Sequence, residues 1–295
     1  MSDCILAIDA GGTSLKYSLK TEDGSHATGG VNAQTPIERE GRPQLLAAFT
    51  QTAESAKRWA EARGHTITRV GVCCPGPFDF VRGMSRMTHK WQDAYEKPIA
   101  PALWAVLGDL PVFFLHDASA FMLGEGLIGA GRDTERVAGV MLGTGFGFGY
   151  MIGGRVQINR HRGPRISIWN TPFGDGIVED YVSRRAIRAR FAALGGDPSA
   201  DVRDIAEAAR ASDGNARKTF ALTGELLGEI LAPVLASLGC TRLIVGGQIA
   251  RSAALFLPYV SVAGTVCVAA HLEDAAMRGM TLYCALGHSA TMEEG

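Results

Sequence analysis

The sequence predicts an α/β protein of two lobes, which implies a cleft between them. The chain has 295 residues, whereas a domain with a single compact core usually has about 100 to 200 residues. Short apolar runs alternate with longer stretches of helical periodicity, and two of these runs end in glycine-rich turns of the same layout. Hydrophobic residues make up 46% of the chain and charged residues 20%, which supplies enough apolar side chains for ordinary globular cores.

The β-strands are expected at the short apolar runs Cys4–Ile8, Tyr17–Leu19, Val70–Cys74, Val112–Leu115, Val137–Leu142, Gly149–Ile152 and Leu243–Val245. The first two runs are joined by the turn in AGGTSLK, with no helix between them. This layout predicts a hairpin and argues against a Rossmann unit, in which the glycines lead into a helix.

The helices are expected where apolar residues recur every three or four positions, at Gln44–Arg63, Ala118–Ile128, Ile177–Leu194 and Asn215–Leu238. The stretch Asn159–Pro172 lacks such a period and is expected to be a loop. The chain has no tandem repeat or Pro/Ser-rich linker, so the lobes are expected to meet at tight crossings. We place the N-terminal lobe at residues 1–115 plus 280–295 and the C-terminal lobe at 116–279.

Charge and composition favour a small-molecule partner. Lys and Arg total 29 against 30 Asp and Glu, so the formal net charge of −1 gives no global attraction to nucleic acid or to a membrane surface. The N-terminus MSDCILAIDAGG lacks the regions of a signal peptide, and no window of about 18 apolar residues is free of charges or glycine clusters. A cytoplasmic protein without a membrane-spanning helix is expected. The six cysteines lie mostly in apolar runs and are expected to be reduced and structural.

The first glycine-rich turn follows the strand in LAIDAGGTSLK. Gly11, Gly12 and Thr13 expose backbone N–H groups that can surround phosphate oxygens. Asp9 ends the strand, and because Mg²⁺ prefers carboxylate and water oxygens, Asp9 is the expected magnesium ligand, directly or through water. The alternative is an ordinary Gly-Gly hairpin with a solvent-facing aspartate.

The second glycine-rich turn, in VAGVMLGTGFGFGYMIGGRV, repeats the strand-turn-strand layout with Gly143, Thr144, Gly145 and Gly147. Two such turns can bind the β- and γ-phosphates from both sides, which positions the donor and offsets its charge. A lone turn of this kind can also be a tight hairpin with close strand packing.

A third glycine signal, RLIVGGQIARSAALF, has a turn at Gly246 and Gly247, and a helix is expected near Ile249. Small residues at this turn, followed by Gln248, would let an adenine ring lie against the backbone. Taken alone, the segment is also an ordinary strand-to-helix connection.

In this order, the motifs resemble the ROK family of bacterial sugar kinases and related regulators. The resemblance spans nearly the whole chain and is carried by IDAGGTSLK, the Pro75-Gly76-Pro77 turn, Asp117-Ala118 followed by Gly124-Glu125, LGTGFGFG and VGGQIA. It implies the two-lobed actin/hexokinase-like (ribonuclease H-like) ATPase fold, ATP and Mg²⁺ as cofactors, and a homodimer. It also adds Lys16 of the first motif to the cofactor-binding residues.

The resemblance makes Asp117 the catalytic base, which accepts a proton from the attacking sugar hydroxyl. Asp117 follows an apolar strand and precedes a helix, so its carboxylate is expected at a strand end near a helix N-terminus. A helix N-cap at DASAF is the alternative, and both roles can coexist. The resemblance also gives the expected substrate-binding residues, which are Pro75, Gly76, His89, His116 and Glu179.

The sugar-binding half departs from the family pattern. His116 stands where the family usually has Asn, so it either alters sugar recognition or closes the strand as a core histidine. Thr88, His89 and Lys90 stand where glucose kinases usually have a sugar-binding Asn. The family's Glu-x-Gly-His segment and zinc-binding cysteines are missing, so no structural zinc is expected. Glu179, in FGDGIVEDYVS, keeps the place of a sugar-binding glutamate or is a helix-surface carboxylate.

The sequence therefore predicts an ATP-dependent kinase for a hydroxyl of a hexose or hexose-like polyol. The alternatives are a kinase for an N-acetylated, acidic or cyclitol substrate, and a non-catalytic sugar- or nucleotide-binding sensor. A DNA-binding repressor is disfavoured, because the first phosphate motif begins within about ten residues of Met1 and leaves no room for a helix-turn-helix before it. The basic loop from Arg155 to Arg165, with Arg160, His161 and Arg162, would recognise an anionic group or polyphosphate in place of ATP, or be a solvated surface.

Overall fold

The computed structural model describes residues 2–25, 33–39, 42–88 and 90–293, which form two compact units. Unit 1 comprises residues 1–124, 155–165 and 274–295, and unit 2 comprises residues 125–154 and 166–273. Asp117 belongs to unit 1, whereas the predicted C-terminal lobe begins at residue 116 and includes it. The predicted lobe boundaries stay a prediction.

Unit 1 is built on a five-stranded sheet in the order β3-β2-β1-β6-β9. Its strands are β1 (Ser2–Ala10), β2 (Ser14–Lys20), β3 (Ala33–Pro36), β6 (His65–Cys74) and β9 (Val112–His116). β1 and β2 pair antiparallel, which confirms the predicted hairpin, whereas β6 runs parallel to β1, and β9 runs parallel to β6. The carboxyl ends of β1, β6 and β9 therefore lie at the same edge of the sheet.

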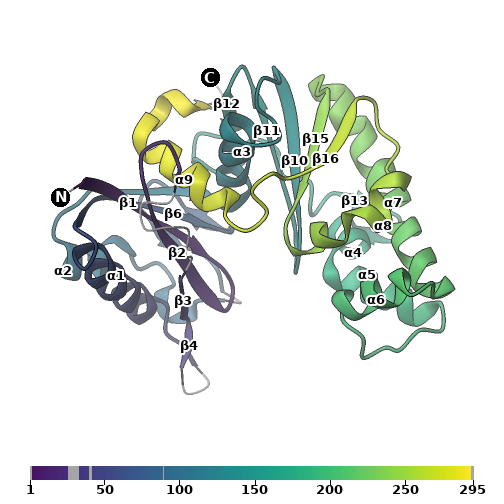
Figure 1. Cartoon of the computed structure of the whole chain (residues 1–295), viewed down its shortest axis with the longest axis horizontal. Helices are drawn as coiled ribbons and strands as arrows, with labels where there is room; N and C mark the ends of the chain where they lie inside the picture. The colour runs from purple at the N-terminus through teal and green to yellow at the C-terminus, as the bar shows by residue number, and fades with distance from the viewer. Residues whose placement is uncertain (1, 26–32, 40–41, 89, 294–295) are drawn as a thin grey trace. The chain divides into compact units, whose positions relative to one another are not determined.

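The main helices of unit 1 are α1 (Leu45–Glu61), α2 (Ala100–Leu107), α9 (Ala275–Leu286) and the first two turns of α3 (Asp117–Ile128). Alternate side chains of the sheet face different helices, as the period of a strand requires. Leu6 and Val70 share a core with α1 and α2, whereas the next residue, Gly71, lies against Met280 and Cys284 of α9. The yellow helix α9 accordingly crosses β1 and β6 in Figure 1.

Glycine lets helices α3 and α9 touch. Gly124 faces the carbonyl of Ala275, and Gly279 faces the carbonyl of Ala120, so closely that a Cβ atom at either glycine would collide with backbone. The two helix backbones are therefore in direct contact. This contact explains why the beginning of α3 belongs to unit 1.

The remaining elements of unit 1 are short: β4 (Glu38–Arg39), β5 (Arg42–Pro43), β7 (Phe78–Asp79), β8 (Met84–Ser85), η1 (Gln92–Ala94), β12 (Arg155–Ile158), η4 (Gly287–Ala290) and β17 (Thr291–Glu293). β12 and β17 pair in parallel. The residues after β12 form the predicted loop, which is folded around Asn159, whose side chain accepts N–H bonds from His161 and Gly163.

Unit 2 contains the strand order β16-β15-β10-β11. The strands are β10 (Arg136–Leu142), β11 (Phe146–Ile152), β15 (Arg242–Gly246) and β16 (Thr265–Val268). β10 and β11 form the second predicted hairpin, while β15 runs parallel to β10 and β16 parallel to β15. A small hairpin of β13 (Pro172–Phe173) and β14 (Gly176–Ile177) precedes the helices.

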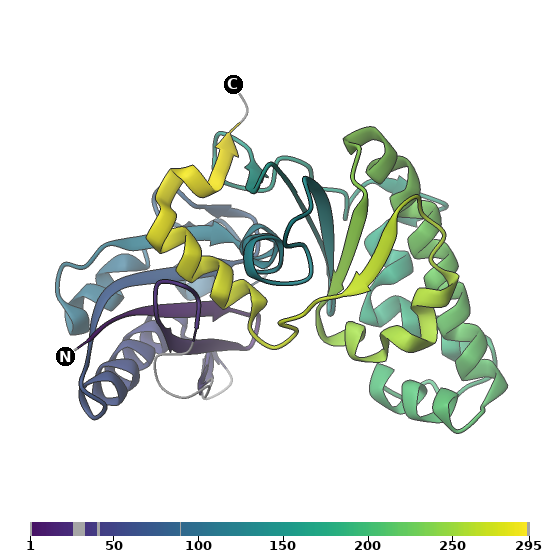
Figure 2. The ribbon, with the colours of Figure 1, turned by 45° about the horizontal axis from the view of Figure 1, so that its top comes forward.

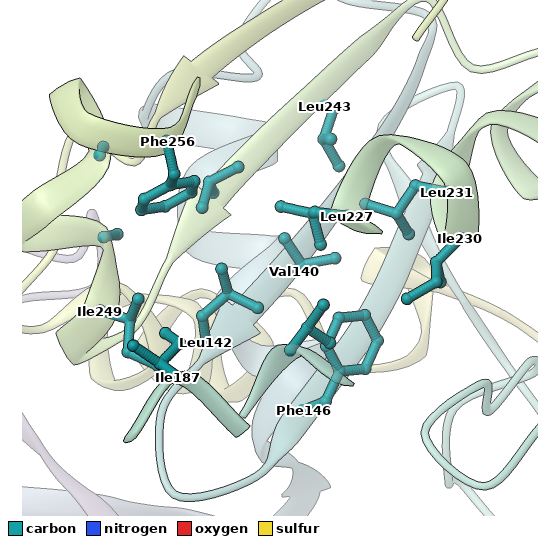
Figure 3. Close-up of a cluster of buried hydrophobic side chains, with 14 of the residues drawn as sticks. Val140, Leu142, Phe146, Ile187, Leu227, Ile230, Leu231, Leu243, Ile249 and Phe256 are labelled. Carbon is teal, nitrogen blue, oxygen red and sulfur yellow. The ribbon is translucent and has the colours of Figure 1, made fainter. Parts of the chain in front are cut away.

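The helices of unit 2 are α4 (Glu179–Val182), α5 (Arg184–Ala193), α6 (Val202–Arg210), α7 (Gly214–Leu238) and α8 (Ala253–Phe256), with η2 (Gln248–Ser252) and η3 (Leu257–Tyr259). They lie on one face of β10 and β15, as the green ribbons in Figure 2 show. Figure 3 shows the core between them, where Val140 and Leu243 of the sheet meet Leu227 and Leu231 of α7.

Two helix predictions need correction. The stretch Ile177–Leu194 is two helices, because Ser183 is extended and caps α5, with its hydroxyl accepting a bond from the Ala186 N–H at 3.4 Å. The helix expected near Ile249 is the 3₁₀ turn η2, followed by the short α8. The predicted helices Gln44–Arg63, Ala118–Ile128 and Asn215–Leu238 are confirmed as α1, α3 and α7.

Helix α7 is the one described helix that is long and apolar enough, by length and composition, to cross a membrane. Phe220, Leu227 and Leu231 of α7 are fully buried in the core of unit 2, so packing within this unit accounts for its apolar character. Glu225 and Glu229 interrupt the apolar run, which is why the sequence predicts no membrane-spanning helix here.

All six cysteines are free. Five are buried, and only Cys267 is half-buried. Burial raises the pKa of Cys4 and of Cys240 to about 11, so these thiols are protonated at neutral pH. Their environment agrees with the predicted structural role.

Candidate active site

The first glycine-rich turn joins β1 to β2 at the carboxyl end of β1. The Gly11 N–H donates to the Ser14 carbonyl at 3.0 Å and closes the turn, and the Thr13 carbonyl accepts a bond from Ile37. The N–H groups of Gly12 and Thr13 have no hydrogen-bond partner among the described residues, and both residues are exposed. Two adjacent free donors on an exposed turn form a site for an anion such as phosphate.

Asp9 lies directly before this turn, in register with Lys16 on β2 and Cys73 on β6. Burial and the negative charge of Asp117 raise the pKa of Asp9 to about 6, against the opposing effects of Lys16 and of the Cys73 thiol. The Cys73 Sγ lies 3.7 Å from Asp9 Oδ1. Since the charge of Asp117 raises the pKa of Asp9, the two carboxylates belong to one electrostatic site within unit 1.

Asp117 is the first residue of α3, directly after β9, and its side chain is 26% exposed. Its Oδ1 accepts the Ala118 N–H at 2.7 Å and lies 3.0 Å from Nδ1 of His116. The Ala118 N also lies 3.2 Å from His116 Nδ1. Because a carboxylate oxygen 3.0 Å from a ring nitrogen requires a proton between them, we assign a proton to His116 Nδ1 and the Ala118 N–H to the nearer Asp117 Oδ1. Two N–H groups therefore hold Oδ1, and Oδ2 is left for a ligand.

These contacts determine the ionisation of Asp117. Burial alone would raise its pKa, but the charge and hydrogen bond of His116, the Ala118 N–H and the charge of Lys90 together hold the pKa of Asp117 below its usual value. Asp117 is therefore ionised at neutral pH, as a general base must be.

The other substrate residues predicted in unit 1 lie at the ends of β6 and β9. Cys74 and His116 are in register on these strands, so the Pro75-Gly76 turn comes beside His116. A Cβ atom built on Gly76 would lie 3.9 Å from His116 Nε2, and the Phe80 ring packs on the imidazole at 5.9 Å. His89 lies outside the described residues.

Lys90 also lies beside the first turn, although the sequence alone does not predict that it binds phosphate. Its Nζ lies 3.7 Å from the position that a Cβ atom on Gly12 would occupy. The predicted metal ligand, catalytic base, His116 and two lysines thus belong to the same unit as the first turn.

The second glycine-rich turn joins β10 to β11 in unit 2. The Gly143 N–H donates to the Gly145 carbonyl at 3.1 Å, and the Gly143 carbonyl accepts the Arg184 N–H at 2.9 Å. The N–H groups of Thr144 and Gly145 have no hydrogen-bond partner among the described residues. Gly147, the last glycine predicted for this site, pairs with Met141 inside the hairpin.

Glu179 lies against this second turn. Its Oε2 accepts the Phe146 N–H at 3.0 Å, and a Cβ atom on Gly145 would lie 2.6 Å from the same oxygen. Glycine at position 145 therefore makes room for the carboxylate. Glu179 is the first residue of α4, and its side chain is half-buried against this turn.

The third glycine signal lies beside the second turn. Gly246 is in register with Met141 near the carboxyl ends of the parallel strands β15 and β10. Gly247 has φ of 82°, and a Cβ atom on it would lie 2.7 Å from the Leu142 N. The Gly246-Gly247-Gln248 segment thus packs directly against the strand that leads into the second turn.

The basic loop is occupied by local contacts. Arg162 Nη2 lies 3.3 Å from His288 Nε2, Arg165 donates to the Gln157 side chain at 3.4 Å, and Arg160 donates to His161 at 3.2 Å. These contacts support a structural role for the loop as much as an anion-binding one.

Among the described residues, no group of three or more His, Cys, Asp or Glu side chains could hold a metal ion. A lone aspartate beside a phosphate turn still suits Mg²⁺, which keeps several waters and takes further ligands from substrate phosphates. Asp9 meets this requirement.

The fold and the two open turns define an α/β phosphate-binding protein, and comparison with known proteins gives its family. The chain belongs to the ROK family, whose model matches residues 5–283. It is similar to a glucokinase of Thermotoga maritima, with 29% identity over 271 residues that cover 84% of this chain and 83% of that protein. It is also similar to the DNA-binding transcriptional repressor Mlc of Escherichia coli, with 24% identity over 66% of this chain and 52% of the repressor.

Solved structures confirm the fold. A ROK family glucokinase from Streptomyces griseus in complex with glucose and AMPPNP matches with a TM-score of 0.75 at 23% identity, covering 94% of this chain and 98% of that chain. The chain therefore has the two-lobed actin/hexokinase-like fold of ROK sugar kinases.

Proposed function

We propose that the chain is an ATP-dependent sugar kinase that phosphorylates a hydroxyl of a hexose or hexose-like polyol. The observation that carries this proposal is the geometry of Asp117, an ionised and partly exposed carboxylate at the same sheet edge as the first phosphate-type turn. Membership of the ROK family and the similarity to a glucokinase over most of both chains support the same activity.

In the proposed reaction, an acceptor hydroxyl oxygen forms a bond to the γ-phosphorus while the bond from that phosphorus to the β–γ bridging oxygen breaks. The hydroxyl proton passes to Oδ2 of Asp117, and ADP leaves. The free N–H groups of Gly12, Thr13, Thr144 and Gly145 would bind phosphate oxygens. Gly246, Gly247 and Gln248 would line the adenine site.

Asp9 would hold Mg²⁺, directly or through water, and the ion would offset phosphate charge when bound. Lys16 supports this role by favouring the ionised form of Asp9. The absence of structural zinc, a homodimeric state and a cytoplasmic location stay predictions.

The acceptor is the open part of the proposal. Pro75, Gly76, His116 and Glu179 would contact it, and His89 stays a predicted contact. With Nδ1 held by Asp117, the His116 ring presents the single atom Nε2 to a ligand, where an Asn offers both a donor and an acceptor. Selectivity for an N-acetylated, acidic or cyclitol acceptor is therefore the alternative, and a sensor without turnover is the second.

An ADP-release assay with ATP and Mg²⁺ across aldohexoses, N-acetylhexosamines, cyclitols and sugar acids tests the proposal. Asp117→Asn should lower kcat about 10³-fold or more, because the amide cannot accept the proton. The control Asp109→Asn, which changes an exposed carboxylate before β9, should retain full activity. Full activity of Asp117→Asn would exclude Asp117 as the base, and ATP binding without turnover of any acceptor would support the sensor.

A further inference from the structure

We propose that Lys90 binds the terminal phosphate of the nucleotide at the first turn and offsets its charge during transfer. This inference rests on the proposed kinase function and adds one cation to its machinery. The sequence places Lys90 only in a segment where glucose kinases usually have a sugar-binding Asn. The fold gives it a different neighbour, the glycine-rich turn.

The Lys90 side chain lies against the first glycine-rich turn. Its Nζ and Cε would lie 3.7 and 3.8 Å from a Cβ atom built on Gly12, so the end of the Lys90 side chain lies beside the exposed turn. The N–H groups of Gly12 and Thr13 are without partners in the described part of the chain. A phosphate at this turn would therefore meet two N–H donors and an ammonium group.

The charge of the site explains why a cation is needed there. Asp9 and Asp117 are both carboxylates, and each would repel a polyphosphate. Lys16 lies in register with Asp9 and acts on its ionisation. Lys90 is exposed, acts on Asp117, and forms no ion pair with an acidic side chain among the described residues. Its positive charge is thus available to a ligand.

The chemistry of phosphoryl transfer uses such a charge. As the hydroxyl oxygen bonds to the γ-phosphorus and the bond to the bridging oxygen breaks, negative charge lies on the oxygens of the transferred group and of ADP. A fixed ammonium group beside these oxygens lowers the barrier without gaining or losing a proton. The proton still passes from the hydroxyl to Asp117.

Lys90→Met and Lys90→Arg test the proposal, with Lys97→Met as the matched control. Lys97 belongs to the same segment, is exposed, and donates to the Asp93 carbonyl at 2.8 Å. Calorimetry would measure the binding of ADP and of AMPPNP with Mg²⁺, and steady-state kinetics would measure kcat with the best acceptor. Circular dichroism would check folding, and Lys90→Gln is a second neutral variant.

Lys90→Met should weaken AMPPNP binding about 10-fold while ADP binding changes less than about 2-fold, because only the triphosphate reaches the lysine. The kcat should fall about 100-fold, as for loss of one group that stabilises transition-state charge. Lys90→Arg should restore most of both losses, and Lys97→Met should behave as the unchanged protein.

Two outcomes would overturn the proposal. Equal weakening of ADP and AMPPNP would place Lys90 away from the terminal phosphate, and a loss confined to the KM of the acceptor would make it a sugar-binding residue. If the unchanged protein phosphorylates no acceptor, the proposed kinase function fails, while the comparison of ADP with AMPPNP still decides the role of Lys90.

Discussion

The two glycine-rich turns have the same pattern of backbone hydrogen bonds but neighbours of opposite charge. In both, the N–H of the first glycine closes the turn, and the next two N–H groups have no partner among the described residues. The first turn has Lys16 and Lys90 close by, whereas the second holds the carboxylate of Glu179 on the Phe146 N–H. Equal backbone geometry therefore does not mean equal affinity for anions.

The difference assigns the turns distinct tasks. The first turn lies beside Asp9 and Asp117, where the proposed reaction would require charge to be balanced during transfer. The second turn is fixed by its own unit, through Glu179 on one side and the Arg184 backbone on the other. We expect the first turn to depend on charged side chains and the second on close packing.

The largest expected effect concerns the ion pairs at the end of the first hairpin. Lys20, fully buried at the end of β2, donates to Asp274 at 2.7 Å, and Arg278 donates to the same carboxylate at 2.9 Å. Asp274→Ala should cost about 3 to 5 kcal/mol of unfolding free energy, because it leaves a buried cation without its carboxylate. Urea denaturation would measure this loss.

Lys20→Met is the matched variant. It should cost clearly less than Asp274→Ala, because Arg278 still neutralises Asp274 and the methionine fills similar space. Equal losses in the two variants would show that packing, rather than charge, anchors this end of the hairpin.

The next effect compares the turns directly. Gly145→Ala would place Cβ against Glu179 Oε2, displace the carboxylate and leave the Phe146 N–H unpaired, at a cost of about 1 to 3 kcal/mol. Gly12→Ala meets only ordinary contacts with Lys90 and should cost less than about 1 kcal/mol. Thermal and urea unfolding of the two variants would measure the difference.

Glu179 supplies the control for this pair. Glu179→Gln keeps an oxygen that can accept the Phe146 N–H and should be nearly as stable as the unchanged protein, whereas Glu179→Ala should resemble Gly145→Ala. If Gly12→Ala were as damaging as Gly145→Ala, the proposed difference between the turns would be wrong.

The smallest effect is on the titration of Asp9. Asp117→Asn removes a negative charge that raises the pKa of Asp9, so this pKa should move down from about 6. Between the ordinary value of 3.8 and about 6 the folded protein binds more protons than the unfolded chain, so the Asp9 contribution to stability falls as pH rises through this window. In Asp117→Asn, the pH range over which Asp9 affects stability should become narrower, because the pKa of Asp9 in the folded protein moves closer to its ordinary value. Carbon-13 NMR titration of labelled aspartate would measure it, and an unchanged Asp9 midpoint would contradict the coupling.

The strands and the turns could be predicted because each apolar run ends at a polar or glycine signal. Asp9 and Asp117 follow such runs, so their positions at strand ends were readable from the sequence. Helix α9 could not be predicted in this way, because its sequence AAMRGMTLYCAL is apolar on nearly all sides and shows no apolar period of three or four residues. The break between α4 and α5 had a local signal in Ser183, a preferred N-cap residue.

The contacts that distinguish the site depend on tertiary structure. Glu179 reaches Phe146 across 33 residues of chain, and Lys90 reaches the Gly12 turn from a different segment of unit 1. No spacing rule relates such pairs. The substitution of Asn by His at position 116 was visible in the sequence, but its bond to Asp117 follows only from the geometry of the β9-α3 junction.

The buried cysteines have a consequence for experiments on this chain. A thiol reacts as its thiolate, and burial raises the pKa of Cys73 and Cys74 well above the ordinary value, beside the proposed site. The five buried thiols should therefore resist maleimides and mild oxidants in the folded protein, and the raised pKa of the half-buried Cys267 should slow its reaction. A cysteine introduced at an exposed position would accept a fluorescent or spin label selectively, which makes nucleotide and sugar binding measurable without removing the natural six.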